Sequence, residues 1–161
     1  MKTLLTLPLL LLSLVSFPSW SDTVDALVVR DGLYYEKFSD VPFTGRLEGL
    51  FQGFIKNGKK EGLWITYYSY GQMWSKGEYK NGKEEGPWVI YWGNGHLSGE
   101  GEYRNGKKEG PWVFYWINGE LLGKGDHRNG KKEGPWVFYW DDGETWNKRS
   151  GVYKDDVKVR D

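Results

Sequence analysis

The sequence predicts an all-β fold: an elongated, single-sheet antiparallel array of β-hairpins, with about four 24-residue units and atypical end caps. Two recurrences predict the units. Asn-Gly dipeptides begin at 57, 81, 105 and 129, and tryptophans recur with the same spacing at Trp64, Trp88, Trp112 and Trp136. A third observation predicts strands, because the apolar runs between turn dipeptides are short and rich in β-branched and aromatic residues.

Residues 1–21 are predicted to be a signal peptide. Lys2 gives a positive start, 4–15 form an apolar run, and Ser19-Trp20-Ser21 has the small-x-small pattern of a cleavage site. An uncleaved membrane anchor is the alternative, but the run is shorter than the roughly 20 residues that span a bilayer, and Pro8 interrupts it. We therefore expect an exported protein, periplasmic or extracellular after cleavage near Ser21. The chain has no cysteine, so neither a lipid anchor at the cleavage site nor a disulfide is available.

Charge does not point to a polyanionic partner. The 161 residues include 22 basic and 22 acidic side chains, and loss of Lys2 with the signal leaves 21 basic against 22 acidic, a net charge of −1. We accordingly expect no nucleic-acid partner. Aromatic residues make up 17% of the chain and glycines number 23, a combination that predicts rings packed on bare backbone.

Residues 22–53 do not keep the period and are predicted to be an N-terminal cap or degenerate repeat. The segments 30–38 and 42–47 indicate two short strands around a turn at Ser39-Asp40. Their expected role is to close the open end of the array against edge-to-edge pairing.

Each regular unit is predicted to hold two strands, exemplified by Trp88–Trp92 and Leu97–Tyr103. Asn94-Gly95 between them suits a two-residue turn with positive φ at both positions. That turn would place Trp92 opposite Leu97 and Trp88 opposite Gly101. The same pattern predicts units at 54–77, 78–101, 102–125 and 126–149. Their predicted structural core is Trp64, Trp88, Trp112 and Trp136 with the facing glycines Gly77, Gly101 and Gly125.

The register between units is left open. A four-residue loop at Asn105–Lys108 keeps the units in phase, whereas a two-residue turn at Asn105-Gly106 slips each unit by two residues. Both registers keep the tryptophans on one face. In the last unit, Arg149 is expected opposite Trp136 where the other units have glycine, and 150–161 form a polar C-terminal capping strand and tail.

The repeated unit Glu-Tyr-x-Asn-Gly-Lys-x-Glu-Gly-Pro-Trp-x-x-Tyr-Trp-x-Asn-Gly resembles the MORN repeat, and more closely its bacterial MORN-variant form. The units 78–101 and 102–125 are near-consensus examples. The resemblance implies a β-hairpin array that acts as an interaction scaffold. Eukaryotic MORN proteins are linked to membrane phospholipids and protein assembly, and some bacterial relatives are regarded as antitoxins, a role that fits poorly with an export signal.

Catalytic and metal-binding chemistry is not predicted. His96 and His127 occupy different positions of the unit and make no metal pair, so no cofactor is expected. The acidic pair Glu84-Glu85 could be compared with glycosidase carboxylates, but Glu85, Glu109 and Glu133 recur in every unit, which is typical of solvated turn residues. We expect a protein without enzyme activity.

Two surfaces are candidate binding sites. The first is a lysine-bearing edge, which either meets lipid headgroups or solubilises the array, and includes Lys60, Lys108 and Lys132. The second consists of tyrosines that alternate to the face opposite the tryptophans: Tyr67, Tyr91, Tyr115 and Tyr139.

The favoured functional hypothesis is an exported, non-enzymatic β-repeat scaffold that binds an unidentified protein, or itself, in a bacterial envelope. A glycan- or choline-binding cell-wall module is the alternative, because regularly spaced rings can serve as platforms for sugars and quaternary ammonium groups. Binding of phospholipid headgroups through the lysine-bearing turns is a third hypothesis.

Overall fold

The computed structural model describes residues 21–22 and 26–161. The predicted signal peptide therefore lies outside the described residues, except for Ser21. Among the residues described, no helix is long and apolar enough to cross a membrane.

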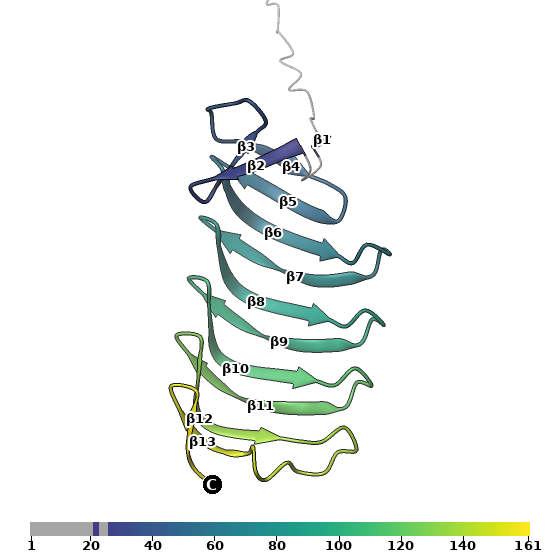
Figure 1. The fold of residues 1–161 in the computed structure, drawn as a ribbon, viewed down its shortest axis with the longest axis vertical. Helices are drawn as coiled ribbons and strands as arrows, with labels where there is room; N and C mark the ends of the chain where they lie inside the picture. The colour runs from purple at the N-terminus through teal and green to yellow at the C-terminus, as the bar shows by residue number, and fades with distance from the viewer. Residues whose placement is uncertain (1–20, 23–25) are drawn as a thin grey trace, which may run out of the picture.

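The fold is an elongated β-sheet built from consecutive hairpins, as the sequence predicts (Figure 1). Apart from a short parallel strand β1 at one edge, neighbours in the sheet are antiparallel, and from β4 onward they follow each other in the chain. The strands of this sheet are β1 (Ser21–Asp22), β4 (Gly45–Leu47), β5 (Phe51–Lys56), β6 (Lys59–Tyr67), β7 (Met73–Lys80), β8 (Lys83–Tyr91), β9 (Leu97–Arg104), β10 (Lys107–Tyr115), β11 (Leu121–Arg128), β12 (Lys131–Phe138), β13 (Gly151–Lys154) and β14 (Val157–Arg160).

The N-terminal cap differs in detail from its prediction. The segment 30–38 is not one strand, because Asp31-Gly32 has positive φ at both residues and forms a turn between β2 (Leu27–Arg30) and β3 (Leu33–Glu36). This small second sheet packs on the first regular turn, where the Tyr34 N–H donates to Gly58 O at 2.9 Å. The cap thus meets the array at the end of β5.

Two kinds of connection alternate along the ribbon, one at each side in Figure 1. At Asn105-Gly106 both residues have positive φ, 53° and 81°, and Arg104 pairs with Lys107, which defines a two-residue turn. At the other side, Gly95 has a φ of 88° and Asn94 is not left-handed.

The tip connection therefore has three residues rather than two. The Trp92 N–H donates to His96 O at 2.8 Å, and Gly95 N–H closes a tight turn onto Trp92 O at 2.9 Å. Consequently Tyr91 lies opposite Leu97, and the predicted pairing of Trp92 with Leu97 is wrong. A three-residue loop with glycine in the left-handed region also suits the right-handed twist of a hairpin, so the dipeptide alone did not determine the turn.

The register between units combines features of both predicted alternatives. The turn at Asn105-Gly106 has two residues, but the pairing jumps from Glu109 with Glu102 to Trp112 with Gly101. A bulge at Gly110-Pro111 takes up the two extra residues, and Gly110 has a φ of 65° there. The units consequently stay in phase. The same left-handed glycine recurs at Gly62, Gly86 and Gly134.

The last unit also pairs its tryptophan with a glycine, although the sequence predicted an arginine at that place. Trp136 pairs with Gly151, not with Arg149. The extra residues before β13 are accommodated in an irregular segment, in which the Ser150 hydroxyl accepts the Phe138 N–H at 2.8 Å. A glycine thus faces every tryptophan of the row, including the final one. Beyond it, β13 and β14 form a closing hairpin whose turn residues, Asp155 and Asp156, both have positive φ.

Candidate functional site

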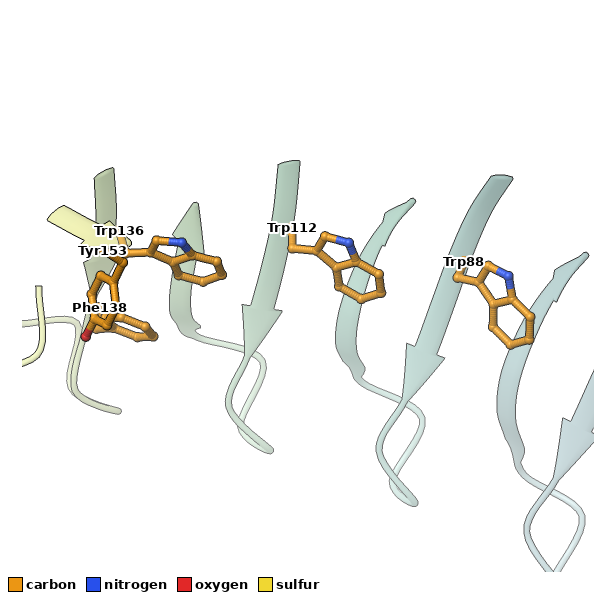
Figure 2. Close-up of a cluster of buried hydrophobic side chains, with 5 residues drawn as sticks. All are labelled: Trp88, Trp112, Trp136, Phe138 and Tyr153. Atoms are coloured by element: carbon orange, nitrogen blue, oxygen red, sulfur yellow. The ribbon is translucent and has the colours of Figure 1, made fainter. Parts of the chain in front are cut away.

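The four in-phase tryptophans form one buried file along a single face of the sheet, and Figure 2 shows three of them, Trp88, Trp112 and Trp136. Their exposed fractions are 2% for Trp64, 7% for Trp88, 0% for Trp112 and 1% for Trp136. This file is the core of the array, and at its N-terminal end Leu27 and Tyr34 of the small second sheet pack against the cluster that contains Trp64. A surface platform for sugars would need exposed ring faces, which these four indoles do not offer.

Each indole is held from two sides. Its ring lies over a glycine of the preceding strand so closely that a Cβ on that glycine would overlap it; the pairs are Gly53–Trp64, Gly77–Trp88, Gly101–Trp112 and Gly125–Trp136. Its N–H donates to a backbone carbonyl ten residues earlier, as from Trp112 Nε1 to Glu102 O at 3.0 Å. Gly53 belongs to this set although it precedes the first predicted unit, so its role was missed from the sequence.

A second row of rings packs edge-on against the tryptophans. Tyr79 and Tyr103 meet Trp88 edge-on from either side, with centroids 5.3 and 5.6 Å away. His127 replaces tyrosine at the equivalent position and lies edge-on to Trp136 at 4.9 Å. After the irregular segment, Tyr153 continues the row.

His127 is the one position in this row that carries a titratable imidazole. It is 7% exposed, and its Nδ1 has no hydrogen-bond partner within the described part of the chain. Burial, followed by the positive charge of Lys108, lowers the pKa of His127 to about 4. The imidazole is therefore neutral at pH 7.

The predicted lysine edge lies over the aromatic rows instead of forming an outward stripe. Lys60 Nζ is 4.5 Å from the centroid of Trp64, and Lys108 Nζ is 4.1 Å from that of Trp112. Lys132 lies farther out, 5.3 Å from the centroid of Tyr153. Burial lowers the pKa of Lys60 and of Lys108. In the second unit Glu84 takes the position that these lysines have in the others, and it accepts a hydrogen bond from the Tyr79 hydroxyl.

The predicted tyrosine surface is half-buried, at Tyr67, Tyr91, Tyr115 and Tyr139. The Tyr115 hydroxyl donates to Glu100 Oε1 at 3.2 Å. Glu100 stands between two glycines that face the aromatic rows, so this contact lies on the opposite face of the sheet. Tyr115 is thus engaged within the array.

The recurrent glutamates join successive hairpins, and their prediction as solvated turn residues is wrong. Glu85 Oε2 accepts the backbone N–H of Asn105 at 2.8 Å, and Glu109 Oε2 accepts that of Asn129 at 2.9 Å. Glu61 and Glu133 do the same for Asn81 and Asp155. The recurrence of these glutamates in every unit could have indicated a structural role. The backbone N–H that each accepts lies 20 to 22 residues along the chain, however, and can be identified only once the register is known.

At the other side of the ribbon, a second tryptophan series links the hairpin tips. Trp92 Nε1 donates to Tyr115 O at 3.0 Å, and Trp116 Nε1 donates to Tyr139 O at 3.2 Å. Asn94 adds a side-chain bond to Ile117 O at 2.8 Å. No such role was predicted for these residues, since the wrong tip turn had placed Trp92 in the strand pairing.

Four large apolar residues of β5, β6 and β7 are partly exposed. Phe54 is 38% exposed and pairs with Glu61 beside the bulge between β5 and β6, and Leu63 is 50% exposed and lies within that bulge. They point away from the tryptophan file, because their chain neighbours Ile55 and Trp64 are buried within it. Phe51 and Trp74 are 37% and 45% exposed.

Phe51 and Trp74 border a pocket of about 330 Å³ on the tryptophan face of β5 to β9. Its polar lining comes from Lys60 and Glu84 and from the hydroxyls of Thr66 and Ser75; the remaining lining residues are Trp64, Tyr79, Trp88, Ile90 and Tyr103. The two hydroxyl oxygens lie 2.6 Å apart and share a hydrogen bond.

The described residues contain no group of three or more side chains arranged to hold a metal ion. Comparison with known proteins finds neither a family model nor a curated protein that matches the chain.

Proposed function

We propose that the protein is an exported, non-enzymatic scaffold of the MORN type, which binds another protein or a second copy of itself through its first repeat. The observation that carries this proposal is the exposure of Phe54 and Leu63 on the face opposite the tryptophan file. Large apolar side chains at such positions support a contact surface.

Comparison of the repeats supports a role outside the fold for these two residues. At the position of Phe54 the later units have Glu78, Glu102 and Asp126, and at the position of Leu63 they have Pro87, Pro111 and Pro135. Those units form the same strands and bulge with acidic and proline residues. The hairpin therefore does not need Phe54 and Leu63 for its own packing.

Two alternative functions receive less support. Headgroup binding requires free lysine ammonium groups, whereas Lys60 and Lys108 lie over aromatic rings. Choline binding requires an empty aromatic cage, and at Trp64 the cation site is taken by Lys60 of the same chain.

The test is a double substitution that gives the first repeat the residues of its neighbours, Phe54→Glu with Leu63→Pro. We expect the parent protein either to self-associate in analytical ultracentrifugation or to retain a specific partner from an envelope extract, and the double variant to lose that association. Its fold is expected to be preserved, because three other units have these residues, and circular dichroism checks this.

Val159→Lys serves as the matched control. Val159 is 59% exposed on the terminal strand β14, far from the first repeat, so this change removes apolar surface elsewhere. The control should keep the association. A parent protein that is strictly monomeric and retains no partner would overturn the proposal, as would an association that survives in the double variant.

A further inference from the structure

The pocket on the tryptophan face exists because the first two units depart from the later ones in a single row across the sheet. In the later units this row pairs Gly99 with Phe114 and Gly123 with Phe138. The ring of Phe114 lies so close to Gly99 that a Cβ there would touch it, so the ring fills the space above that strand. In the first two units the row instead holds Thr66, Ser75 and Ile90.

These smaller residues leave space beside an aromatic wall. Phe51 pairs with Thr66 at one side of the pocket, and Ile90 pairs with Ser75 at the other. Trp74 stands at the rim, at the place where the pairing of β6 with β7 is shifted. Its exposed ring is not required by the hairpin, because Ser98 and Leu122 occupy the same position in the following units.

The polar lining is charged but balanced. Lys60 Nζ is 4.8 Å from the centroid of Tyr79, whose hydroxyl donates to Glu84 Oε1 at 3.2 Å. Burial, and then the neighbouring Glu84 carboxylate, raise the pKa of Tyr79, so the phenol keeps its proton. One ammonium and one carboxylate thus line the same cavity, beside the paired hydroxyls of Thr66 and Ser75.

This combination selects a class of ligand. A cationic ligand would meet Lys60, and an anionic ligand would meet Glu84, so neither is favoured over its opposite. A purely apolar group would bury both charges and the two hydroxyls without partners, at a cost. A neutral polyol with an apolar ring face satisfies all of them, since it can stack on an aromatic side chain and both donate and accept hydrogen bonds.

We propose that this pocket binds one pyranose ring of a neutral sugar, which stacks against Trp74 and forms hydrogen bonds with Lys60 and Glu84. A volume of about 330 Å³ lies at the lower end of the range for small-molecule sites. The pocket lies on the opposite face of the sheet from Phe54 and Leu63. Sugar binding is therefore a further role beyond the proposed scaffold, and each of the two proposals can be tested without the other.

The experiment is a titration of the full exported chain, followed by tryptophan fluorescence and by calorimetry. The probes are methyl glucoside, methyl galactoside, N-acetylglucosamine and their disaccharides, with choline and inorganic phosphate as charged probes. We expect saturable binding of at least one neutral sugar, with a dissociation constant on the order of 1 mM or lower, and no saturable binding of either charged probe.

Three variants drawn from the other units locate the site. Ser75→Gly with Ile90→Phe installs the Gly99 and Phe114 pair and should abolish binding by filling the pocket. Trp74→Ser copies Ser98 and should weaken binding by roughly tenfold through loss of the stacking surface. Glu84→Lys copies Lys108 and should also weaken it, because two ammonium groups then face the sugar. Phe54→Glu with Leu63→Pro should leave sugar binding unchanged.

The inference is overturned if no neutral sugar binds at about 50 mM, well above the dissociation constant expected for this pocket. Saturable binding of choline or phosphate in the same pocket would contradict the ligand class. Sugar binding that is equal in the parent and in the pocket-filled variant would place it elsewhere on the protein. Near-parental melting temperatures of the variants, each of which copies residues of another unit, keep loss of folding from explaining loss of binding.

Discussion

His127 places an imidazole, which gains a positive charge in acid, where the other units have a phenol. Tyr79 and Tyr103 occupy the equivalent positions, and all three side chains pack edge-on against the tryptophan file. Burial and the nearby ammonium of Lys108 disfavour the imidazolium, whereas Asp156 and Asp126 favour it more weakly than burial opposes it. A side chain that is structurally interchangeable with tyrosine thus makes the stability of the array sensitive to pH.

The sign of that dependence follows from the pKa of about 4 in the folded chain against 6.5 for an ordinary histidine. Between these values the unfolded chain binds a proton that the folded chain does not. The stabilisation is complete above pH 6.5 and is lost as the pH falls toward 4, by up to about 3 kcal/mol. We expect His127→Tyr to remove most of this loss, as measured by urea unfolding between pH 4 and 7.

His96→Gln is the control for that measurement, because it copies Gln72 at an exposed hairpin tip. It should retain the parental pH dependence. If His127→Tyr and the parent protein lose stability in parallel over this range, the depressed pKa of His127 is not the cause.

At the scale of the hairpin, successive units are joined by hydrogen bonds at both sides of the ribbon. The glutamates before the bulge accept backbone N–H groups of the next turn, and the tip tryptophans donate to carbonyls of the next unit. Regular strand pairing alone would leave those groups to solvent. The turns therefore stack in a fixed register.

Glu109→Ala tests the contribution of one such link. It leaves the Asn129 N–H without its carboxylate acceptor, and we expect the free energy of unfolding to fall by about 1 kcal/mol. In a domain of this size that corresponds to a melting temperature lower by about 2 to 4 °C. Glu102→Ala, at an exposed position on β9, should change it by less than half as much. Equal effects of the two substitutions would show that the link contributes nothing.

Hairpins and strand positions could be predicted from the sequence, but details that depend on contacts between units could not. The period and the alternation of residues indicated the strands and placed Trp88 opposite Gly101. The tip turn was predicted wrongly because Asn94-Gly95 also suits a three-residue loop, in which only the glycine is left-handed. The bulge at Gly110-Pro111 was not anticipated, since a glycine before a proline also fits the start of a strand.

The candidate site likewise had one part that the sequence predicted and one part that depends on contacts between units. The sequence indicated the buried tryptophan file, whose composition is repeated in every unit. The pocket of the first two units was missed, because it depends on Thr66, Ser75 and Ile90 lying in one row across the three strands β6, β7 and β8. Residues that differ from the repeat do not indicate a shared site until the strand register shows which of them are neighbours in space.

At the scale of the whole molecule, the in-phase register makes the units interchangeable. Deletion of 102–125 joins Gly101 to Asp126, so Gly101 takes the place of Gly125 opposite Trp136. We expect a folded protein that is less stable and shorter by about 10 Å, the width of two strands, in small-angle scattering. Deletion of 102–113 removes half a period and should abolish cooperative unfolding. Loss of folding in both variants would contradict interchangeable units.

The central claim is that the array is held together by indoles packed on glycines of the preceding strand. The most direct measurement is a double-mutant cycle between Gly101 and Trp112, by chemical unfolding. Gly101→Val alone should cost about 3 kcal/mol or more, because its side chain overlaps the Trp112 ring. In a Trp112→Ala background the same change should cost at least about 1 kcal/mol less, whereas in a Trp88→Ala background its cost should be unchanged. Additive effects of Gly101→Val and Trp112→Ala would contradict the claim.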